Sequence, residues 1–204
     1  MSYAILGLVS YLLGAVPFGL LIGKMRGVDV RTVGSKNIGA TNVLRTVGKP
    51  WGILTFLLDA LKGFVPAFVF PTLGNRFGLD FQSLEIAALI GGAAAIVGHN
   101  FPLYLGFKGG KGVATSAGAL LGIAPLAVGV GLVVWIVIFY TTRYVSLASI
   151  QAALAVPIVG WLYYRTAGVA VPIALTLLAA LIIVRHRANI RRLLNGTENR
   201  FKKK

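Results

Sequence analysis

The chain has 204 residues, of which 57% are hydrophobic and 12% charged, and its mean hydropathy is +0.83. This composition excludes an ordinary soluble domain and predicts an integral membrane protein. The net charge of +15 favours anionic lipids or anionic substrates as partners, while the hydrophobicity argues against nucleic acid. Without any cysteine the chain has no disulfide, thiolate metal site or cysteine nucleophile, and we expect no cofactor or metal.

The first half of the chain predicts three membrane-spanning helices. Residues 3–22 are apolar and lack the preceding basic residues of a cleaved signal peptide, so they read as a retained helix. The loop at 23–50 carries six basic residues and one acidic residue, which places it in the cytoplasm and the N-terminus outside. Residues 51–70 and 84–105 then cross outward and back, joined by a short external turn.

The uncharged stretch at residues 113–140 is too long for one ordinary crossing. As a single helix it would measure about 42 Å, against a hydrocarbon core of about 30 Å. One crossing would also leave the basic C-terminal tail outside, contrary to the positive-inside rule. We therefore predict two segments with a turn near residues 122–125, the first so short that it enters the membrane only part-way.

Two further crossings, at residues 145–164 and 167–184, complete the predicted architecture. The chain is expected to be an all-α polytopic membrane protein with seven transmembrane segments, an external N-terminus and a cytoplasmic C-terminus. Seven crossings of about 20 residues each leave room only for short loops, so residues 1–204 should form a single integral-membrane domain. In this topology most basic residues and all polar motifs lie on the cytoplasmic side.

The first polar motif lies in the loop at residues 34–45. Ser35 is predicted to cap a short helix, on which Asn37, Thr41 and Arg45 would share one face because they are spaced at i, i+4 and i+8. First-turn amides together with a guanidinium suit a phosphate group. Taken by itself, the pattern fits equally well an interfacial helix that places Arg45 on lipid headgroups.

The second motif is the glycine-rich loop at residues 106–112, which leads into a predicted helix. The N–H groups of such a turn can form a nest for phosphate, and Lys108 and Lys111 add positive charge. The loop matches neither the Walker A motif nor the dinucleotide fingerprint, so ATP use has no support. The alternative is a flexible basic turn between helices. His99, shortly before the loop, could accept a proton, hydrogen-bond a substrate or merely satisfy a backbone carbonyl.

Three smaller groups of polar residues complete the survey. Asp59 and Lys62 lie three residues apart within the second span, where we expect them to pair structurally. Arg143 adds a cation before a predicted helix and indicates little alone. His186 and Asn189 share one face of the basic C-terminal extension, although binding to anionic lipid is the simplest role for that segment.

Together these motifs resemble the bacterial membrane family of acyl-phosphate:glycerol-3-phosphate acyltransferases over nearly the whole chain. The resemblance is carried by residues 34–42, 99–102, 107–115 and 186–190, with Gly196 and Glu198. It implies that sn-glycerol 3-phosphate attacks a fatty acyl phosphate through its 1-hydroxyl, giving 1-acylglycerol 3-phosphate and inorganic phosphate. Neither acyl-CoA nor acyl carrier protein would be the direct donor. The reaction would be the first acylation of phospholipid synthesis, at the cytoplasmic face of the bacterial inner membrane.

The motifs and the resemblance together define the expected site. The expected catalytic residues are Ser35, Arg45, Lys111, His186 and Asn189. The expected substrate-binding residues are Lys36, Asn37, Thr41, Asn42, His99, Lys108, Gly109, Gly110, Gly112, Thr115, Arg143, Ser146 and Glu198. The resemblance implies that the loop at 108–112 binds glycerol phosphate and that His186, Asn189 and Glu198 are needed for activity or integrity.

The expected chemistry requires no covalent nucleophile, because an acyl phosphate already carries a good leaving group. Ser35 would then donate a hydrogen bond, His186 and Asn189 would position the substrate, and a substrate phosphate would take the hydroxyl proton. Membrane lipids are further partners, and the sequence leaves open a transient contact with the enzyme that makes the acyl phosphate. The main alternative is a transporter or channel for a phosphorylated metabolite, against which the one-sided placement of the cations argues.

Overall fold

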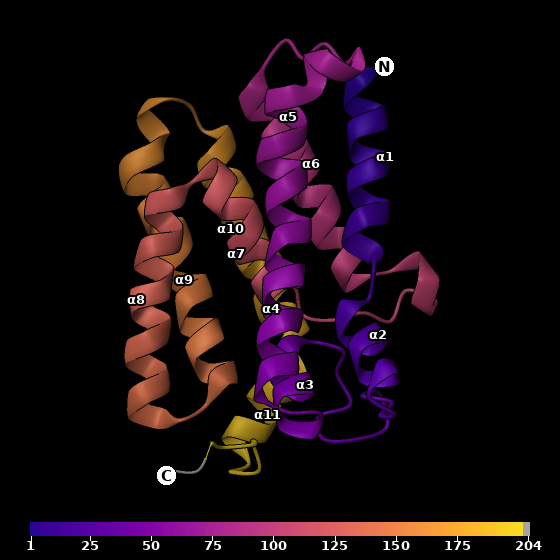
Figure 1. The fold of residues 1–204 in the computed structure, drawn as a ribbon. Helices are drawn as coiled ribbons and strands as arrows, with labels where there is room; N and C mark the ends of the chain where they lie inside the picture. Colours follow the sequence, from indigo (N-terminus) through magenta and orange to yellow (C-terminus); the bar gives the residue numbers. More distant parts are fainter. Residues whose placement is uncertain (202–204) are drawn as a thin grey trace. The chain divides into compact units, whose positions relative to one another are not determined.

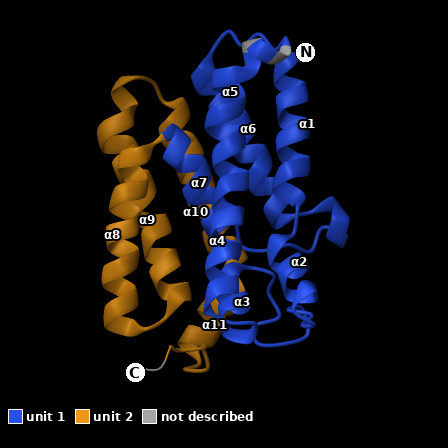
Figure 2. Ribbon diagram, viewed as in Figure 1, with its two compact units in different colours: residues 1–123 blue, residues 124–204 orange. Residues whose placement is uncertain are grey.

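The computed structural model describes residues 1–201, apart from the side chains of residues 75 and 77. Every regular element within that range is helical, so the predicted all-α class is confirmed for the described chain. The helices divide into two compact units, residues 1–123 and 124–204 (Figure 2). The polar motifs are divided between the two units, because the first two motifs belong to unit 1 and the C-terminal extension belongs to unit 2.

Unit 1 contains three long helical segments and several short ones (Figure 1). In chain order its elements are α1 (Ser2–Ala15), α2 (Phe18–Met25), α3 (Ala40–Thr46), α4 (Lys49–Phe64), the π-helical turn η1 (Val65–Val69), α5 (Phe70–Leu73), η2 (Gly74–Phe77), α6 (Leu84–Asn100), η3 (Leu103–Leu105) and α7 (Val113–Ile123). Figure 1 shows α2 and α3 at the end of unit 1 that lies away from the N-terminus. The first polar motif therefore lies at that end.

The first predicted span contains a break that the hydropathy pattern does not reveal. α1 ends at Ala15, and α2 begins at Phe18 after Pro17. Proline lacks a backbone N–H and its ring excludes the preceding helical turn, so the helix is interrupted at this point. The carbonyl of Val16 at the break accepts the backbone N–H of Phe18 at 3.1 Å. It also accepts a second hydrogen bond from Lys62 Nζ at 2.7 Å, which pairs this oxygen fully in an apolar region.

Close backbone contact joins α4 to α7. A Cβ at Gly118 would collide with the carbonyl of Ala60, and a Cβ at Gly63 would collide with the carbonyl of Thr115. Small residues on facing helices allow this approach, which is the usual packing mode where no hydrophobic effect drives association. α7 is thereby held along α4, and the glycine-rich loop that precedes α7 is anchored at its downstream end.

Unit 2 contains a helical hairpin followed by a bent helix pair. Its elements are α8 (Pro125–Thr142), α9 (Val145–Tyr163), η4 (Tyr164–Thr166), α10 (Ala170–Arg185) and α11 (Arg187–Leu194). α10 and α11 meet at an angle of 57°. The predicted turn near residues 122–125 is present, because α7 ends at Ile123 and α8 begins at Pro125.

Several helices are long and apolar enough to cross a membrane. Within the described residues these are the five segments Ser2–Met25, Lys49–Leu73, Leu84–Leu105, Pro125–Thr142 and Val145–Thr166, and α10 with α11 adds a sixth if the bent pair counts as one span. The short apolar helix α7 has 11 residues and a length of about 16 Å. The multi-span character is thus confirmed, while the count of seven and the orientation remain predictions.

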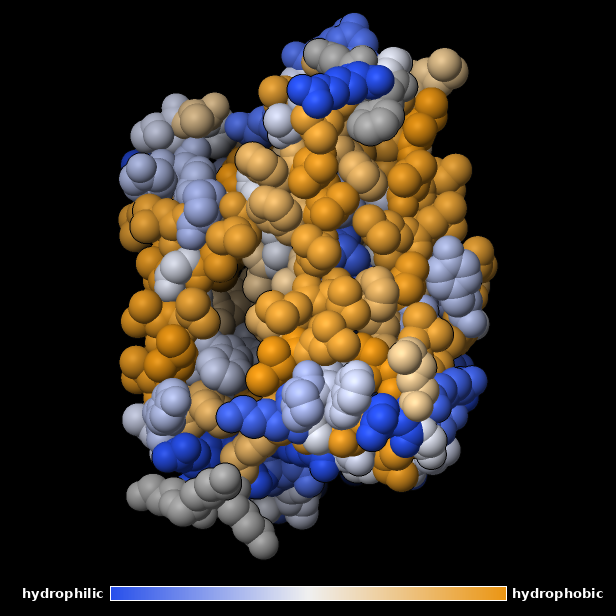
Figure 3. All heavy atoms as spheres, in the orientation of Figure 1, coloured by the Kyte–Doolittle hydropathy of each residue, from blue (hydrophilic) through white to orange (hydrophobic). Residues whose placement is uncertain are grey.

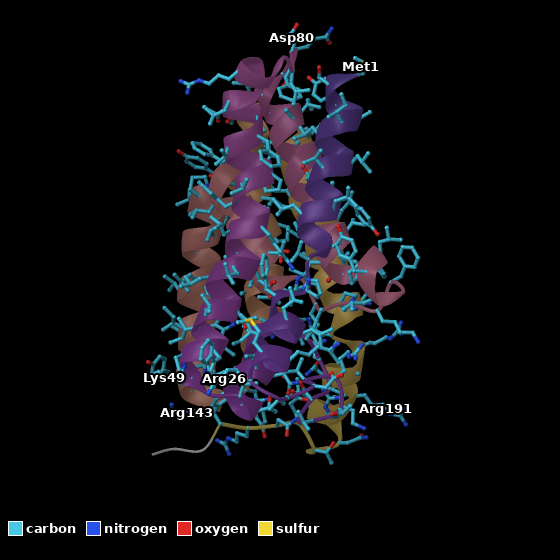
Figure 4. All side chains as sticks on the ribbon, turned by 45° about the vertical axis from the view of Figure 1, so that its right-hand side comes forward. Met1, Arg26, Lys49, Asp80, Arg143 and Arg191 are labelled. Carbon is cyan, nitrogen blue, oxygen red and sulfur yellow. The ribbon has the colours of Figure 1, made fainter. Side chains whose placement is uncertain are left out.

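Charged groups and apolar surface separate along unit 1. Figure 4 shows Arg26 and Lys49 at one end of this unit and Met1 and Asp80 at the other. On the face of unit 1 visible in Figure 3, hydrophobic residues cover the helices between the two ends, and hydrophilic residues gather toward the end that carries α2 and α3. This distribution is typical of helices that cross a bilayer.

Candidate active site

The segment before α3 is organised around the buried side chain of Asn42. Its Nδ2 donates to the carbonyls of Val30 at 2.8 Å, Val33 at 3.2 Å and Asn37 at 2.9 Å. Its Oδ1 accepts the amide N–H of Ser35 at 2.8 Å. These contacts engage both the donor and the acceptor side of the amide. The geometry therefore assigns Asn42 a structural role, and its expected contact with substrate remains a prediction.

The expectation that Ser35 caps a helix is wrong. α3 begins only at Ala40, with Gly39 at its N-cap position and without a side-chain cap. The flanking residues Gly34 and Lys36 have φ angles of 59° and 57°, and residues in this left-handed region keep the chain out of a right-handed helix. Ser35 instead lies half-buried in a loop, and its backbone position is fixed by Asn42.

The expected polar stripe on this helix is correspondingly shorter. Asn37 lies outside α3, where its Oδ1 accepts the N–H of Gly39 at 2.9 Å in a local turn. Only Thr41 and Arg45 belong to the helix itself, and their i, i+4 spacing keeps them on one face. Both side chains are half-buried, whereas Lys36 is exposed.

The glycine-rich loop is folded back against the end of α6. The amide N–H of Gly109 donates to the carbonyl of Asn100 at 3.2 Å, and that of Gly110 donates to the carbonyl of His99 at 3.1 Å. Two amides expected in a phosphate nest are therefore engaged within the protein. The groups that remain as candidates for binding phosphate are Lys108, Lys111, Gly112 and the first turn of α7. The first amides of a helix have no acceptor within the helix, so they can bind an anion.

Thr115 lies deeper in α7 and is fully buried. Its hydroxyl has no hydrogen-bond partner among the described residues, and its carbonyl abuts Gly63 of α4. The substrate contact expected of Thr115 remains a prediction.

The two lysines of the glycine-rich loop differ in their access to solvent, because Lys108 is exposed and Lys111 is half-buried.

His99 lies between an acidic side chain and the glycine-rich loop. Its Nδ1 is 3.7 Å from Asp59 Oδ1, and its Nε2 lies so close to Gly110 that no Cβ would fit there. The same carboxylate oxygen of Asp59 is 2.8 Å from Lys62 Nζ, which confirms the expected pair within α4. The side chain of His99 thus packs inside unit 1, an outcome that its position in the sequence does not reveal.

In unit 2 a single carboxylate gathers the residues of the C-terminal motif. Glu198 Oε1 accepts hydrogen bonds from Ser146 Oγ at 2.9 Å and from Asn189 Nδ2 at 2.7 Å. Its Oε2 accepts one from Arg192 Nε at 2.7 Å. Burial raises the pKa of Glu198, but the hydrogen bonds from Asn189, Arg192 and Ser146 outweigh it and hold that pKa below its usual value. The ionised side chain of Glu198 thus connects the tail to α9 and α11 by hydrogen bonds.

Arg192 was absent from the residues expected at the site. The only available signal is that Glu198 is the sole acidic residue in an otherwise basic tail, so a cationic partner on the neighbouring helix was to be expected. Sequence spacing alone does not select Arg192 from the other arginines of α11, because the tail turns back at Gly196, whose φ is 67°.

His186 lies at the bend between α10 and α11. Its side chain is buried, and Nδ1 is 2.8 Å from the carbonyl of Ile182. When Nδ1–H donates this bond, Nε2 is the acceptor of the neutral imidazole. Asn189, three residues later, is also buried, and its Oδ1 accepts no hydrogen bond within residues 1–201. Asn189 Oδ1 therefore offers an acceptor for a hydroxyl group.

Arg143 ends α8 in a left-handed conformation, with a φ of 66°. Its Cζ lies 5.4 Å from the ring centroid of Tyr140, and its carbonyl accepts the amide N–H of Phe201 at 3.0 Å. Arg143 thereby anchors the tail through its backbone. Figure 4 shows Arg143 and Arg191 at the same end of unit 2.

Comparisons with known proteins place these motifs in context. Residues 4–196 match the family model described as glycerol-3-phosphate acyltransferase. The curated relatives include glycerol-3-phosphate acyltransferases from Geobacter sulfurreducens, 49% identical over 97% of both chains, and from Aquifex aeolicus, 45% identical over 98% of this chain and 100% of the relative.

Two crystal structures have a similar fold. Both are of PlsY (YgiH), an integral membrane glycerol 3-phosphate acyltransferase. The glycerol 3-phosphate form has a TM-score of 0.87 and 44% sequence identity, and the lysophosphatidic acid form has a TM-score of 0.84 and 43% identity. In each case the similarity covers 99% of this chain and 96% of the other.

Proposed function

Because the chain belongs to the glycerol-3-phosphate acyltransferase family, we propose that it transfers a fatty acyl group from acyl phosphate to the 1-hydroxyl of sn-glycerol 3-phosphate. The products are lysophosphatidic acid and inorganic phosphate, and the reaction begins phospholipid synthesis. The family match across residues 4–196 carries this conclusion, since it includes the loop at residues 34–45, the glycine-rich loop, and His186 with Asn189. The chain is an enzyme, and the transporter alternative is not favoured.

The choice of acyl phosphate as donor follows from the chemistry of the residues. An acyl phosphate is a mixed anhydride, so its carbonyl can be attacked directly by the glycerol hydroxyl while phosphate leaves. We assign Ser35 as a hydrogen-bond donor, because its backbone is fixed by Asn42 and no histidine is found among its hydrogen-bond partners in the described structure. Arg45 and Lys111 are assigned to the phosphoryl groups, where a guanidinium can bind bidentately.

In unit 2 we assign His186 and Asn189 to the attacking hydroxyl. His186 Nδ1 is directed to a backbone carbonyl, which orients the ring, and the Asn189 amide is oriented by Glu198. Such second contacts fix side chains that would otherwise rotate. A phosphate oxygen of the substrate then takes the proton, because a phosphate monoester has a second pKa of about 6.

The membrane arrangement completes the proposal. Seven transmembrane segments follow if α7 enters part-way and α10 crosses, with the N-terminus outside and the site facing the cytoplasm of a bacterium. The basic loop between α2 and α4 supports this orientation. Both units would belong to one acyltransferase domain, since the family model spans the two. Membrane lipids surround it, and the enzyme that supplies acyl phosphate is a candidate transient partner.

One experiment tests the reaction directly. Purified protein in detergent or lipid is incubated with glycerol 3-phosphate and acyl phosphate, and lysophosphatidic acid and released phosphate are measured. We expect equal amounts of both products, and none when acyl-CoA replaces acyl phosphate. Uptake of labelled glycerol 3-phosphate into sealed vesicles, without acylated product, would instead support a transporter.

A further inference from the structure

We propose that Asp59, Lys62 and His99 form a buried positioning cluster that fixes the glycine-rich loop at residues 106–112 for glycerol 3-phosphate. This inference rests on the proposed function, because it assigns that loop to that substrate. The three side chains act through the backbone that they hold, so this proposal assigns His99 to positioning in place of the substrate contact expected from the sequence.

The charges of Asp59 and Lys62 are costly where they lie. Asp59, Lys62 and His99 are 2%, 3% and 4% exposed, and Asp59 and Lys62 lie within an apolar helical segment. Ionisable groups in such segments are costly and are usually retained for function. An apolar pair of similar volume would often give equal or greater stability than a buried ion pair. Packing alone therefore does not account for the two charges of α4.

His99 contacts the glycine-rich loop through both its ring and its backbone. The imidazole of His99 occupies the space that a Cβ at Gly110 would need, and the His99 carbonyl accepts the Gly110 amide at 3.1 Å. Ring and backbone of one residue thus hold the same glycine. On the opposite side of the ring, Asp59 Oδ1 lies 3.7 Å from Nδ1. At that distance the carboxylate forms no hydrogen bond with the ring, and it acts on the imidazole through its charge and by filling the space beside Nδ1.

Lys62 makes a second contact besides its ion pair with Asp59. Its Nζ lies 2.8 Å from Asp59 Oδ1 and donates to the carbonyl of Val16 at 2.7 Å. The ammonium group therefore ties α4 to the break between α1 and α2. Because Lys62 holds Asp59 from one side, Asp59 presents a fixed oxygen to His99 on the other. The cluster links the membrane-embedded helices to the loop through one continuous series of contacts.

A purely structural ion pair is the competing explanation. It predicts that loss of the pair lowers stability without a selective effect on either substrate. The positioning role predicts a selective loss of affinity for glycerol 3-phosphate in a protein that is still folded. A charge-balanced variant separates the two, because it removes both charges and leaves no uncompensated group.

The test uses the full-length Asp59→Asn/Lys62→Gln variant in detergent. We expect the KM for glycerol 3-phosphate to rise about tenfold, while the KM for acyl phosphate and the unfolding temperature stay close to those of the wild type. Thr55→Val is the matched control. Thr55 is fully buried on the same helix, and its hydroxyl only donates to the carbonyl of Trp51, so neither KM should change.

A second variant tests whether Asp59 acts through His99. In a His99→Gln background, the charge-balanced substitutions should cause little further rise in the KM for glycerol 3-phosphate, because residues that act in series give non-additive effects. Multiplicative effects, or an unchanged KM in the folded charge-balanced variant, would overturn the positioning role.

Hydrogen exchange separates failure of this inference from failure of the proposed function. The amides of Gly109 and Gly110 should exchange faster in the charge-balanced variant than in the wild type, without any substrate present. Equal exchange rates would contradict the cluster's hold on the loop. If the wild type makes no lysophosphatidic acid but the exchange rates differ, the cluster stands and the assignment of the loop to glycerol 3-phosphate falls.

Discussion

Asp59 of unit 1 and Glu198 of unit 2 each hold a functional motif, but they do so with different partners. Asp59 faces a lysine and a histidine within apolar helices. Glu198 faces a serine, an asparagine and an arginine at a tail. In an apolar interior a carboxylate needs a full countercharge, whereas near water neutral donors supply much of the stabilisation. We therefore expect substitution of the carboxylate to cost more stability at Asp59 in unit 1 than at Glu198 in unit 2.

The largest effect is expected from Asp59→Ala, because it leaves the ammonium of Lys62 buried without its countercharge. Breaking a buried pair in this way costs about 3–5 kcal/mol, which thermal unfolding in detergent would detect. Asp59→Asn/Lys62→Gln serves as its control and should recover most of the lost stability. Equal destabilisation by both variants would show that the charges of α4 are not coupled.

Arg45→Lys should leave stability unchanged and weaken the use of substrate. Lysine offers a point charge where arginine offers a planar fork, so we expect kcat/KM to fall about 10- to 100-fold. Steady-state kinetics with each substrate varied would measure the change, and an unfolding curve would show whether the fold is intact. An unchanged dependence on both substrates would remove Arg45 from the site.

Glu198→Gln should release the tail. The neutral amide has one acceptor oxygen in place of two, so its nitrogen must oppose either Arg192 or the pair of Ser146 and Asn189. Either outcome loosens the tail that orients Asn189, and activity should fall about tenfold. Limited digestion with trypsin would show faster cleavage after Arg192 in the variant, because this half-buried residue loses its bond to Glu198. Because Arg187 and Arg191 are already exposed, cleavage after these two residues provides the internal reference.

The same carboxylate predicts a dependence on pH. A depressed folded-state pKa means that the stabilisation from Glu198 is fully present above the usual glutamate range and is lost as the pH falls through the lowered value. Tail protection against an acid-stable protease should therefore persist at pH 5 and decline only at more acidic pH. In Glu198→Gln this pH dependence should be absent.

The smallest effect is expected from the exposed pair of Asp29 and Arg31. Their side chains form an ion pair of 2.6 Å, and hydrogen bonds from Arg31 lower the pKa of Asp29 to about 2. Exposed pairs contribute little to stability because water and salt screen them. Arg31→Gln should leave unfolding and kinetics unchanged. A loss comparable to that of Asp59→Ala would mean that burial does not decide the strength of these pairs.

The sequence was sufficient for those features that depend on hydropathy and length. The long apolar segments, the turn before Pro125 and the pairing of Asp59 with Lys62 all follow from spacing and from the cost of charges in lipid. The family resemblance also follows from local motifs. These features need no knowledge of which distant residues meet.

The remaining features depend on contacts between distant residues. Asn42 donates hydrogen bonds to carbonyls of a loop whose path is set by residues with left-handed φ angles. No periodic pattern in the sequence predicts such a loop. The amides of the glycine-rich loop are engaged because the loop folds back on α6. Arg192 is found only once the tail is seen to turn. In each case the decisive partner lies outside the local motif.

The break in the first span has a consequence for how the protein enters its membrane. The Val16 carbonyl receives its lysine donor from a residue 46 positions further along the chain. During synthesis the first helix therefore reaches the bilayer with only the local bond from the Phe18 N–H, at 3.1 Å, to this oxygen, and hydrocarbon offers no second donor. Insertion of the first two spans together, as a hairpin, is therefore favoured, because α4 adds the charged donor Lys62 to this oxygen.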